Sequence, residues 1–160
     1  MTILKADHRD VKRLLTELAE SDEGPERDRM AAEVHKALKV HMELEERLVY
    51  PLVEREVGEE DAEEANIEHG LARDGLATMM SMVDKPGFGA AVEMVKGGIE
   101  HHVQEEESEL LPELKDKLDR TEWLALGDAI AHGKADAGVP LPPTRKSTKR
   151  SNKRRATAKK

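Results

Sequence analysis

Two stretches of the chain, residues 41–51 and 102–112, repeat one pattern of residue types. Each begins with a histidine, has a glutamate four residues later, and ends with a proline; the two copies are 61 residues apart. The same offset relates His8 to His69, so each half of the chain has two histidines separated by 33 residues. This repetition predicts two similar halves that bring four histidines and two glutamates together about an approximate twofold axis.

Within each copy, the histidine and the glutamate are spaced to lie on one face of an α-helix, as His41 and Glu45 in the first and His102 and Glu106 in the second. Both pairs interrupt a stripe of apolar residues, and a buried carboxylate is costly unless it is paired or binds a metal. Imidazole and carboxylate without thiolate suit iron, manganese or zinc. Six such ligands exceed the needs of one tetrahedral zinc ion and suit two metal ions bridged by the carboxylates.

Apolar residues recur every three or four positions over four segments, about 4–19, 26–58, 60–83 and 89–118, which predicts four amphipathic helices. Pro51 and Pro112 are expected to kink the second and fourth helices or to end them early. The predicted inner face of the second helix includes Leu48 and Leu52, and that of the fourth helix includes Leu110. Short connections favour an all-α, up-down-up-down four-helix bundle.

The C-terminal part has a different composition. A short fifth helix is predicted over residues 121–132, with Thr121 as its cap, packing across an open end of the bundle. Residues 134–160 are predicted to be a disordered basic tail beyond a domain of residues 1–133. The net charge of −8 divides into about −17 for the first 140 residues and +9 for the last 20. The tail, mainly residues 144–160, is expected to be a solubilising extension or, alternatively, to bind nucleic acid or another polyanion without sequence preference.

Composition limits the other classes of function. The chain has no cysteine, which excludes disulfides, zinc–thiolate sites and cysteine-ligated iron–sulfur clusters. It has no apolar run long enough for a membrane span and nothing that resembles a signal peptide. A cytoplasmic protein that does not bind membranes is therefore expected.

The two His-x-x-x-Glu-Glu frames ending in proline, together with the dipeptides Asp7-His8 and Glu68-His69, resemble the hemerythrin family, in its branch called the HHE cation-binding domain. The resemblance covers about residues 3–118. It implies a four-helix bundle around two iron ions, bridged by two carboxylates and an oxo or hydroxo group, with manganese or zinc less favoured. The ligands that it implies by position are His8, His41, Glu45, His69, His102 and Glu106.

One position departs from the family pattern. Oxygen-carrying hemerythrins have a further histidine one turn after the ligand in the third helix, whereas this chain has Arg73 there and Lys12 at the corresponding place in the first helix. The lost ligand favours reaction with oxygen, peroxide or nitric oxide, including catalase-like activity, over reversible oxygen carriage. No residue identifies a dedicated acid or base. Arg73 is expected either to pair with a glutamate at the site or to extend outward.

Several alternatives remain open at this stage. The six residues form a hydrogen-bonded polar cluster if they bind no metal, and His101 with Glu105 has the same spacing as His102 with Glu106, although the distance to Pro112 favours His102. Tyr50 is expected on the opposite side of its helix from His41. Residues predicted to lie outside the site are Glu46, Glu107 and Glu105, on a solvated acidic face, and His35 and His132, as surface or packing residues. The alternative function is an iron- or oxygen-responsive regulatory module whose basic tail engages nucleic acid.

Overall fold

A computed structural model of the chain describes residues 2–141, and these residues contain helices and no strand. Met1 and residues 142–160, which include the predicted basic tail from residue 144 onward, lie outside the described residues. In chain order the elements are α1 (Thr2–Ala19), α2 (Pro25–Leu44), η1 (Glu45–Val49), α3 (Tyr50–Glu56), α4 (Glu59–Ser81), α5 (Phe88–Glu105), η2 (Glu106–Leu110), α6 (Leu111–Lys117) and α7 (Arg120–Asp136). The predicted all-helical class is confirmed.

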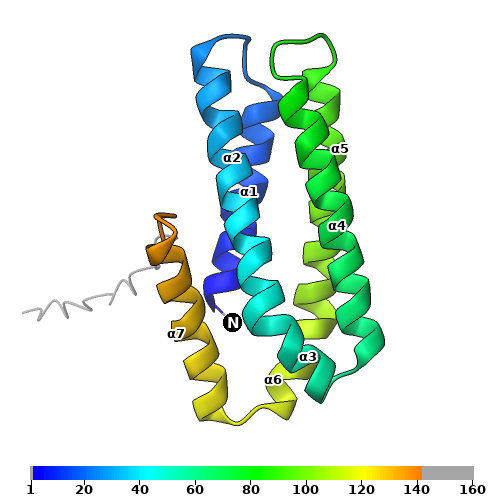
Figure 1. Ribbon diagram of the computed structural model, residues 1–160, viewed down its shortest axis with the longest axis vertical. Helices are drawn as coiled ribbons and strands as arrows, with labels where there is room; N and C mark the ends of the chain where they lie inside the picture. The colour runs from blue at the N-terminus through cyan, green and yellow to red at the C-terminus, as the bar shows by residue number, and fades with distance from the viewer. Residues whose placement is uncertain (1, 142–160) are drawn as a thin grey trace, which may run out of the picture.

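The long helices α1, α2, α4 and α5 lie side by side (Figure 1). Helix α1 packs against α2 and α5, and α4 packs against α5 and α2, so the four enclose a common interior. Within residues 2–141, no helix has the length and apolar character needed to cross a lipid bilayer.

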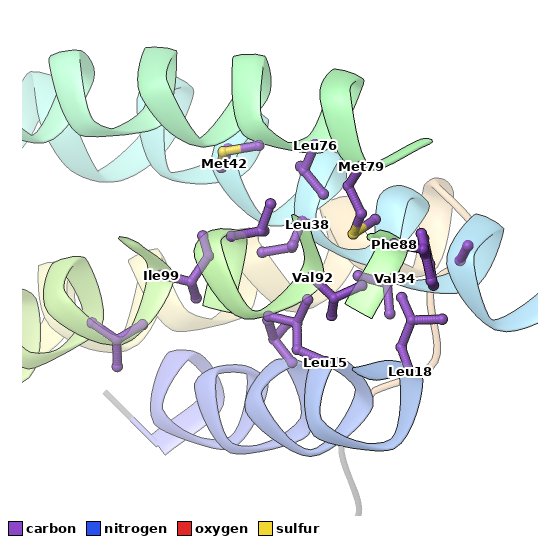
Figure 2. Close-up of a cluster of buried hydrophobic side chains, with 14 residues drawn as sticks. Leu15, Leu18, Val34, Leu38, Met42, Leu76, Met79, Phe88, Val92 and Ile99 are labelled. Carbon is purple, nitrogen blue, oxygen red and sulfur yellow. The ribbon is translucent and has the colours of Figure 1, made fainter. Parts of the chain in front are cut away.

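The interior contains two apolar clusters. One includes Leu15, Leu38 and Val92 and fills the bundle toward the α1–α2 and α4–α5 connections (Figure 2). The other includes Leu4 and Leu114 and joins the opposite end of the bundle to α3, α6 and α7. In α1, α2 and α4 the repeated histidine falls between residues of the two clusters, and in the fourth helical path His102 precedes Leu111 of the second cluster, so a polar layer separates two apolar ones.

The turns η1 and η2 are π-helical, and a single residue separates the end of each from the proline that closes a copy of the repeat. The backbone N–H of Tyr50 donates to the carbonyl of Glu45, and that of Leu111 donates to Glu106, each across five residues. Proline lacks an N–H and its ring clashes with the carbonyl four residues earlier, which a wider turn relieves. The predicted interruption at each proline therefore takes the form of a π turn, and the helical path continues through α3 and α6.

The π turns correct the predicted inner faces of these helices. Leu48, Leu52 and Leu110 were expected to point inward but are only half-buried, whereas Val49 and Leu111 are 0% and 1% exposed. A π turn contains about one residue more than an α turn, so it moves the inward face one position along the chain. The prediction assumed a helical period of 3.6 residues along the whole of the second and the fourth helix. That assumption was wrong beyond Glu45 in the second helix and beyond Glu106 in the fourth.

Helix α7 also differs from its prediction. Its N-cap is Asp119 and not the predicted Thr121. The side chain of Asp119 accepts from the N–H of Glu122, and the Glu122 carboxylate accepts from the N–H of Asp119. The helix continues to Asp136, four residues beyond the predicted end, and Lys134 within it is buried. It packs along α1, α2 and η1 on the flank of the bundle and not across an end (Figure 1).

Candidate metal centre

The structure brings all six residues of the repeated pattern together in the polar layer. Each of the helices α1, α2, α4 and α5 contributes one histidine, and the first residue of each π turn is one of the two glutamates. All six are buried, the most exposed at 6%: His8, His41, Glu45, His69, His102 and Glu106.

Glu45 lies between two pairs of histidines. Its Oε2 is 3.1 Å from Nε2 of His41 and 3.5 Å from Nε2 of His69, and its Oε1 is 3.7 Å from Nε2 of His8. Two groups of side chains are compact enough to hold a metal ion, and Glu45 belongs to both: His8, His41 and Glu45, and Glu45, His69 and His102. A carboxylate in that position suits two cations that share it.

Glu106 occupies the related place in the second half of the chain. Its Oε2 lies 3.4 Å from Nε2 of His8 and 3.8 Å from Nε2 of His102. The same edge of each imidazole, the one with Nε2, thus faces a central carboxylate.

The opposite edge of each imidazole, with Nδ1, faces a carboxylate outside the centre. An Nδ1–H donated to such a carboxylate leaves the Nε2 lone pair directed inward, the tautomer that a metal-binding histidine requires. Three pairs are within hydrogen-bond distance between Nδ1 and a carboxylate oxygen: His8–Glu107 (2.8 Å), His69–Glu46 (3.0 Å) and His102–Glu68 (2.7 Å). Nδ1 of His41 lies 3.8 Å from Asp7, too far for a hydrogen bond. The expectation of a solvated acidic face is wrong for Glu46 and Glu107, which orient histidines.

Each outer carboxylate also has a cationic or imidazole partner. Arg73 places Nη2 at 2.5 and 2.6 Å from the two oxygens of Glu46, so the pairing alternative for this residue is confirmed. The remaining pairs are Lys5 with Glu107 at 3.5 Å, His101 with Glu68 at 3.4 Å, and the buried Lys134 with Asp7. The arginine and the two lysines among these partners offset part of the negative charge that surrounds the histidines.

The inner donor atoms fit a metal. Both carboxylate oxygens of Glu45, Oε2 of Glu106 and Nε2 of His8 are buried and have no hydrogen-bond partner among the described residues. An unsatisfied buried polar group costs about 1–3 kcal/mol, and the cost for an unpaired charge is larger. Burial, acting alone, would raise the pKa of Glu45 and lower that of His8, but the attraction between the closely spaced imidazoles and carboxylates outweighs it. The pKa of Glu45 is therefore held well below its usual value and that of His8 is raised to about 10.

Tyr50 belongs to the centre, contrary to the expectation that it lies on the far side of the helix. Its hydroxyl is 2.9 Å from Nε2 of His69, 3.4 Å from Nε2 of His102 and 3.2 Å from Oε1 of Glu106. The π turn η1 lies between His41 and Tyr50 and rotates the tyrosine inward. Burial, with the charges of the nearby carboxylates, raises the pKa of Tyr50 far above its usual value, so the phenol keeps its proton. The sequence signal for the inward position of Tyr50 is the proline at position 51, repeated at 112, because a proline at this place indicates an irregular turn just before it.

The histidines outside the repeat lie apart from this arrangement. His101 is exposed and contacts Glu68 and Glu105, so the structure places His102, and not its neighbour, in the centre. His132 is held by the backbone carbonyl of Asp128, and His35 is half-buried on α2.

The sequence was compared with known families and proteins. The model of the family described as "Hemerythrin HHE cation binding domain" matches residues 1–114. The chain belongs to this family. Membership in the HHE family indicates a cation-binding module, and the match includes all six buried histidines and glutamates of the centre.

A curated protein described as "DNA nickase", from Nostoc sp. (strain PCC 7120 / SAG 25.82 / UTEX 2576), is 28% identical over 117 residues. That alignment covers 72% of this chain and 33% of the Nostoc protein, so the chain spans about a third of that relative's length. No solved structure matches the chain.

Proposed function

We propose that this HHE-family chain is a non-haem di-iron protein that binds or reacts with oxygen, peroxide or nitric oxide. The observation that carries the proposal is the paired donor set, in which four imidazole Nε2 edges face two buried carboxylates. The proposed ligands are the six residues of the repeat, His8, His41, Glu45, His69, His102 and Glu106, held in an up-down-up-down bundle. Iron is proposed over manganese or zinc because the family's usual cation is iron.

The bound iron would supply the redox chemistry, and the protein would hold and surround it. Glu46, Glu68 and Glu107 fix the ring orientation of three histidines, and the apolar clusters on both sides limit access of water to the centre. Tyr50 keeps a phenolic proton between His69 and Glu106, where it would donate a hydrogen bond to an oxygen-containing ligand. Its counterpart in the repeat is Leu111, so the two halves of the centre differ in polarity.

Iron content tests this proposal first. Protein produced in iron-replete cells, without added metal, is expected to contain about two irons per chain. The His69→Ala variant is expected to lose at least one of them, whereas His35→Ala, on α2 outside the centre, is expected to keep both. Visible spectra recorded with oxygen, peroxide and nitric oxide then identify the reactive ligand. An unaltered chain without iron, manganese or zinc would refute the metal centre, and an iron-loaded chain that responds to none of the three ligands would refute its reactivity.

A second function, an iron- or oxygen-responsive module that engages nucleic acid, is favoured by the basic segment and by the name of the Nostoc relative. Residues 141–160 have nine lysines or arginines and no acidic residue. If they neutralise six or more phosphates, the affinity for duplex DNA is expected to fall by about 10³-fold or more between 50 and 200 mM salt. Fluorescence anisotropy of the full chain, with a chain that ends at residue 141 as the control, measures this. Equal binding by the two chains would refute the role of the segment.

A further inference from the structure

A small cavity of about 100 Å³ lies between α4 and the start of η2 and reaches the metal centre. Its inner wall includes His102 and Glu106, which are 4% and 1% exposed. The other residues that line it are mostly acidic: Asp61, Glu64, Ala65, Glu68, Glu105, Glu109 and Leu110. A path lined by carboxylates thus runs from the surface of the protein to two of the proposed iron ligands.

Three side chains beside this cavity form a cluster of donor atoms that could hold a metal ion. Nε2 of His101 lies 3.4 Å from Oε1 of Glu68 and 3.4 Å from Oε1 of Glu105, and the ligand atoms of the three residues lie within 4.8 Å of one another. The other oxygen of Glu68 is 2.7 Å from Nδ1 of His102. One carboxylate therefore contacts both the outer cluster and a histidine of the centre.

An independent observation at the inner end of the cavity also points to a cation. Oε2 of Glu106 is buried and has no hydrogen-bond partner in the part of the chain that the structure describes. A buried carboxylate oxygen in this condition is stabilised by a nearby cation, and Glu106 is among the residues that line the acidic cavity.

The repeat supplies an internal comparison, because the corresponding surface of the first half is mostly apolar, and Asp7, the counterpart of Glu68, is paired there with Lys134 of α7. Subtracting 61 from Glu64, His101, Glu105 and Glu109 gives, in the same order, Ile3, Val40, Leu44 and Leu48. These four apolar residues belong to, or pack against, the cluster that contains Leu126 and Ile130 of α7. Gly133 of the same helix lies so close to Leu44 that a Cβ at position 133 would overlap its side chain. Helix α7 therefore covers one of two related openings, and the other is left open and acidic.

We propose that the acidic cavity between α4 and η2 is the route by which divalent cations enter the centre, with Glu68, His101 and Glu105 as a transient binding site on the way. This inference rests on the proposed metal centre. Carboxylates around a narrow opening raise the local concentration of cations and the rate of their association. His101 is exposed and Glu105 is half-buried, so this outer cluster holds an ion less firmly than the buried centre and passes it inward.

The rate of metal uptake by the full chain tests the route. Metal-free protein is mixed with Co²⁺ at low ionic strength in a stopped-flow instrument, and the visible absorption of the bound ion is followed. The Glu105→Gln/Glu109→Gln variant is expected to bind Co²⁺ about 3- to 10-fold more slowly than the unaltered chain, with a weaker dependence of the rate on salt. The matched control is Asp22→Asn/Glu23→Gln, which changes the net charge equally at the exposed α1–α2 connection, at the far end of the bundle.

The outcomes separate the route from the centre. A slower approach to an unchanged final amount of bound Co²⁺, seen only in the cavity variant, supports the route. Equal rates in the two variants overturn it while leaving the metal centre in place. An unaltered chain that binds no Co²⁺, and contains no metal when isolated, overturns the centre and the route together.

Discussion

Replacement of Lys134 with methionine is expected to lower the free energy of unfolding by about 3–5 kcal/mol. Lys134 is 5% exposed and its ammonium group pairs with Asp7, which is 4% exposed. Methionine fills a similar volume, so the main loss is the charge, and a buried carboxylate then remains without its cation. Urea denaturation followed by circular dichroism, with a chelator present to exclude any contribution from metal, measures the change.

Two further variants define what the result means. Lys36→Met removes an exposed ammonium group that donates to the carbonyl of Gly138, and it is expected to cost less than about 1 kcal/mol. Asp7→Leu combined with Lys134→Met removes both charges and is expected to recover much of the lost stability, because two apolar side chains replace a buried ion pair. A loss below about 1 kcal/mol in Lys134→Met alone would show that the pair is hydrated and that α7 is held by its apolar residues only.

The position of Lys134 connects α7 to the centre. Asp7 places its second oxygen 3.8 Å from Nδ1 of His41, so the ion pair with Lys134 fixes the carboxylate beside a proposed ligand. Helix α7 begins at Arg120, after the last residue matched by the HHE family, yet one of its side chains helps to build the surroundings of the family's site. Loosening α7 is therefore expected to affect the His8–His41 side of the centre before the His69–His102 side.

The residues of the centre could be predicted from the sequence because their spacing is a local property. A histidine and a glutamate four residues apart share a helix face in any α-helix, and the 61-residue offset supplied the second copy without reference to tertiary structure. The same reasoning selected His102 over His101, and the structure buries His102 while it leaves His101 exposed.

The features that were missed depend on departures from the regular helix or on tertiary contacts. Tyr50 and Leu111 turn inward only because a π turn precedes each of them, and helical periodicity alone does not include such a turn. Glu46 orients His69 through a contact between η1 and α4, and the sequence around Glu46 has no signal for such a contact. Lys134 was assigned to a basic tail because its neighbours are small and polar, although α7 buries it against Asp7.

Loading with metal is expected to raise the melting temperature of the unaltered chain by about 10 °C for each ion when the free metal is at about 100 times its dissociation constant. Binding under that condition adds about 2.7 kcal/mol per site. For a helical body of this size, 1 kcal/mol corresponds to roughly 4 °C. Calorimetry of the metal-free protein and of the same protein with Fe²⁺ added under anaerobic conditions measures the difference.

The Glu45→Ala variant is expected to lose nearly all of this increase, and to do so for both ions. The reason is the shared position of Glu45, whose oxygens face His8 and His41 on one side and His69 on the other. The control is Glu43→Ala, which removes an exposed glutamate two residues earlier on α2 and is expected to keep the full effect of metal. If Glu45→Ala lost the increment of one ion only, the carboxylate would serve a single metal and the second would depend on Glu106. If the variant kept both increments, the buried carboxylate would be a structural group, and the case for a metal between the two histidine pairs would fail.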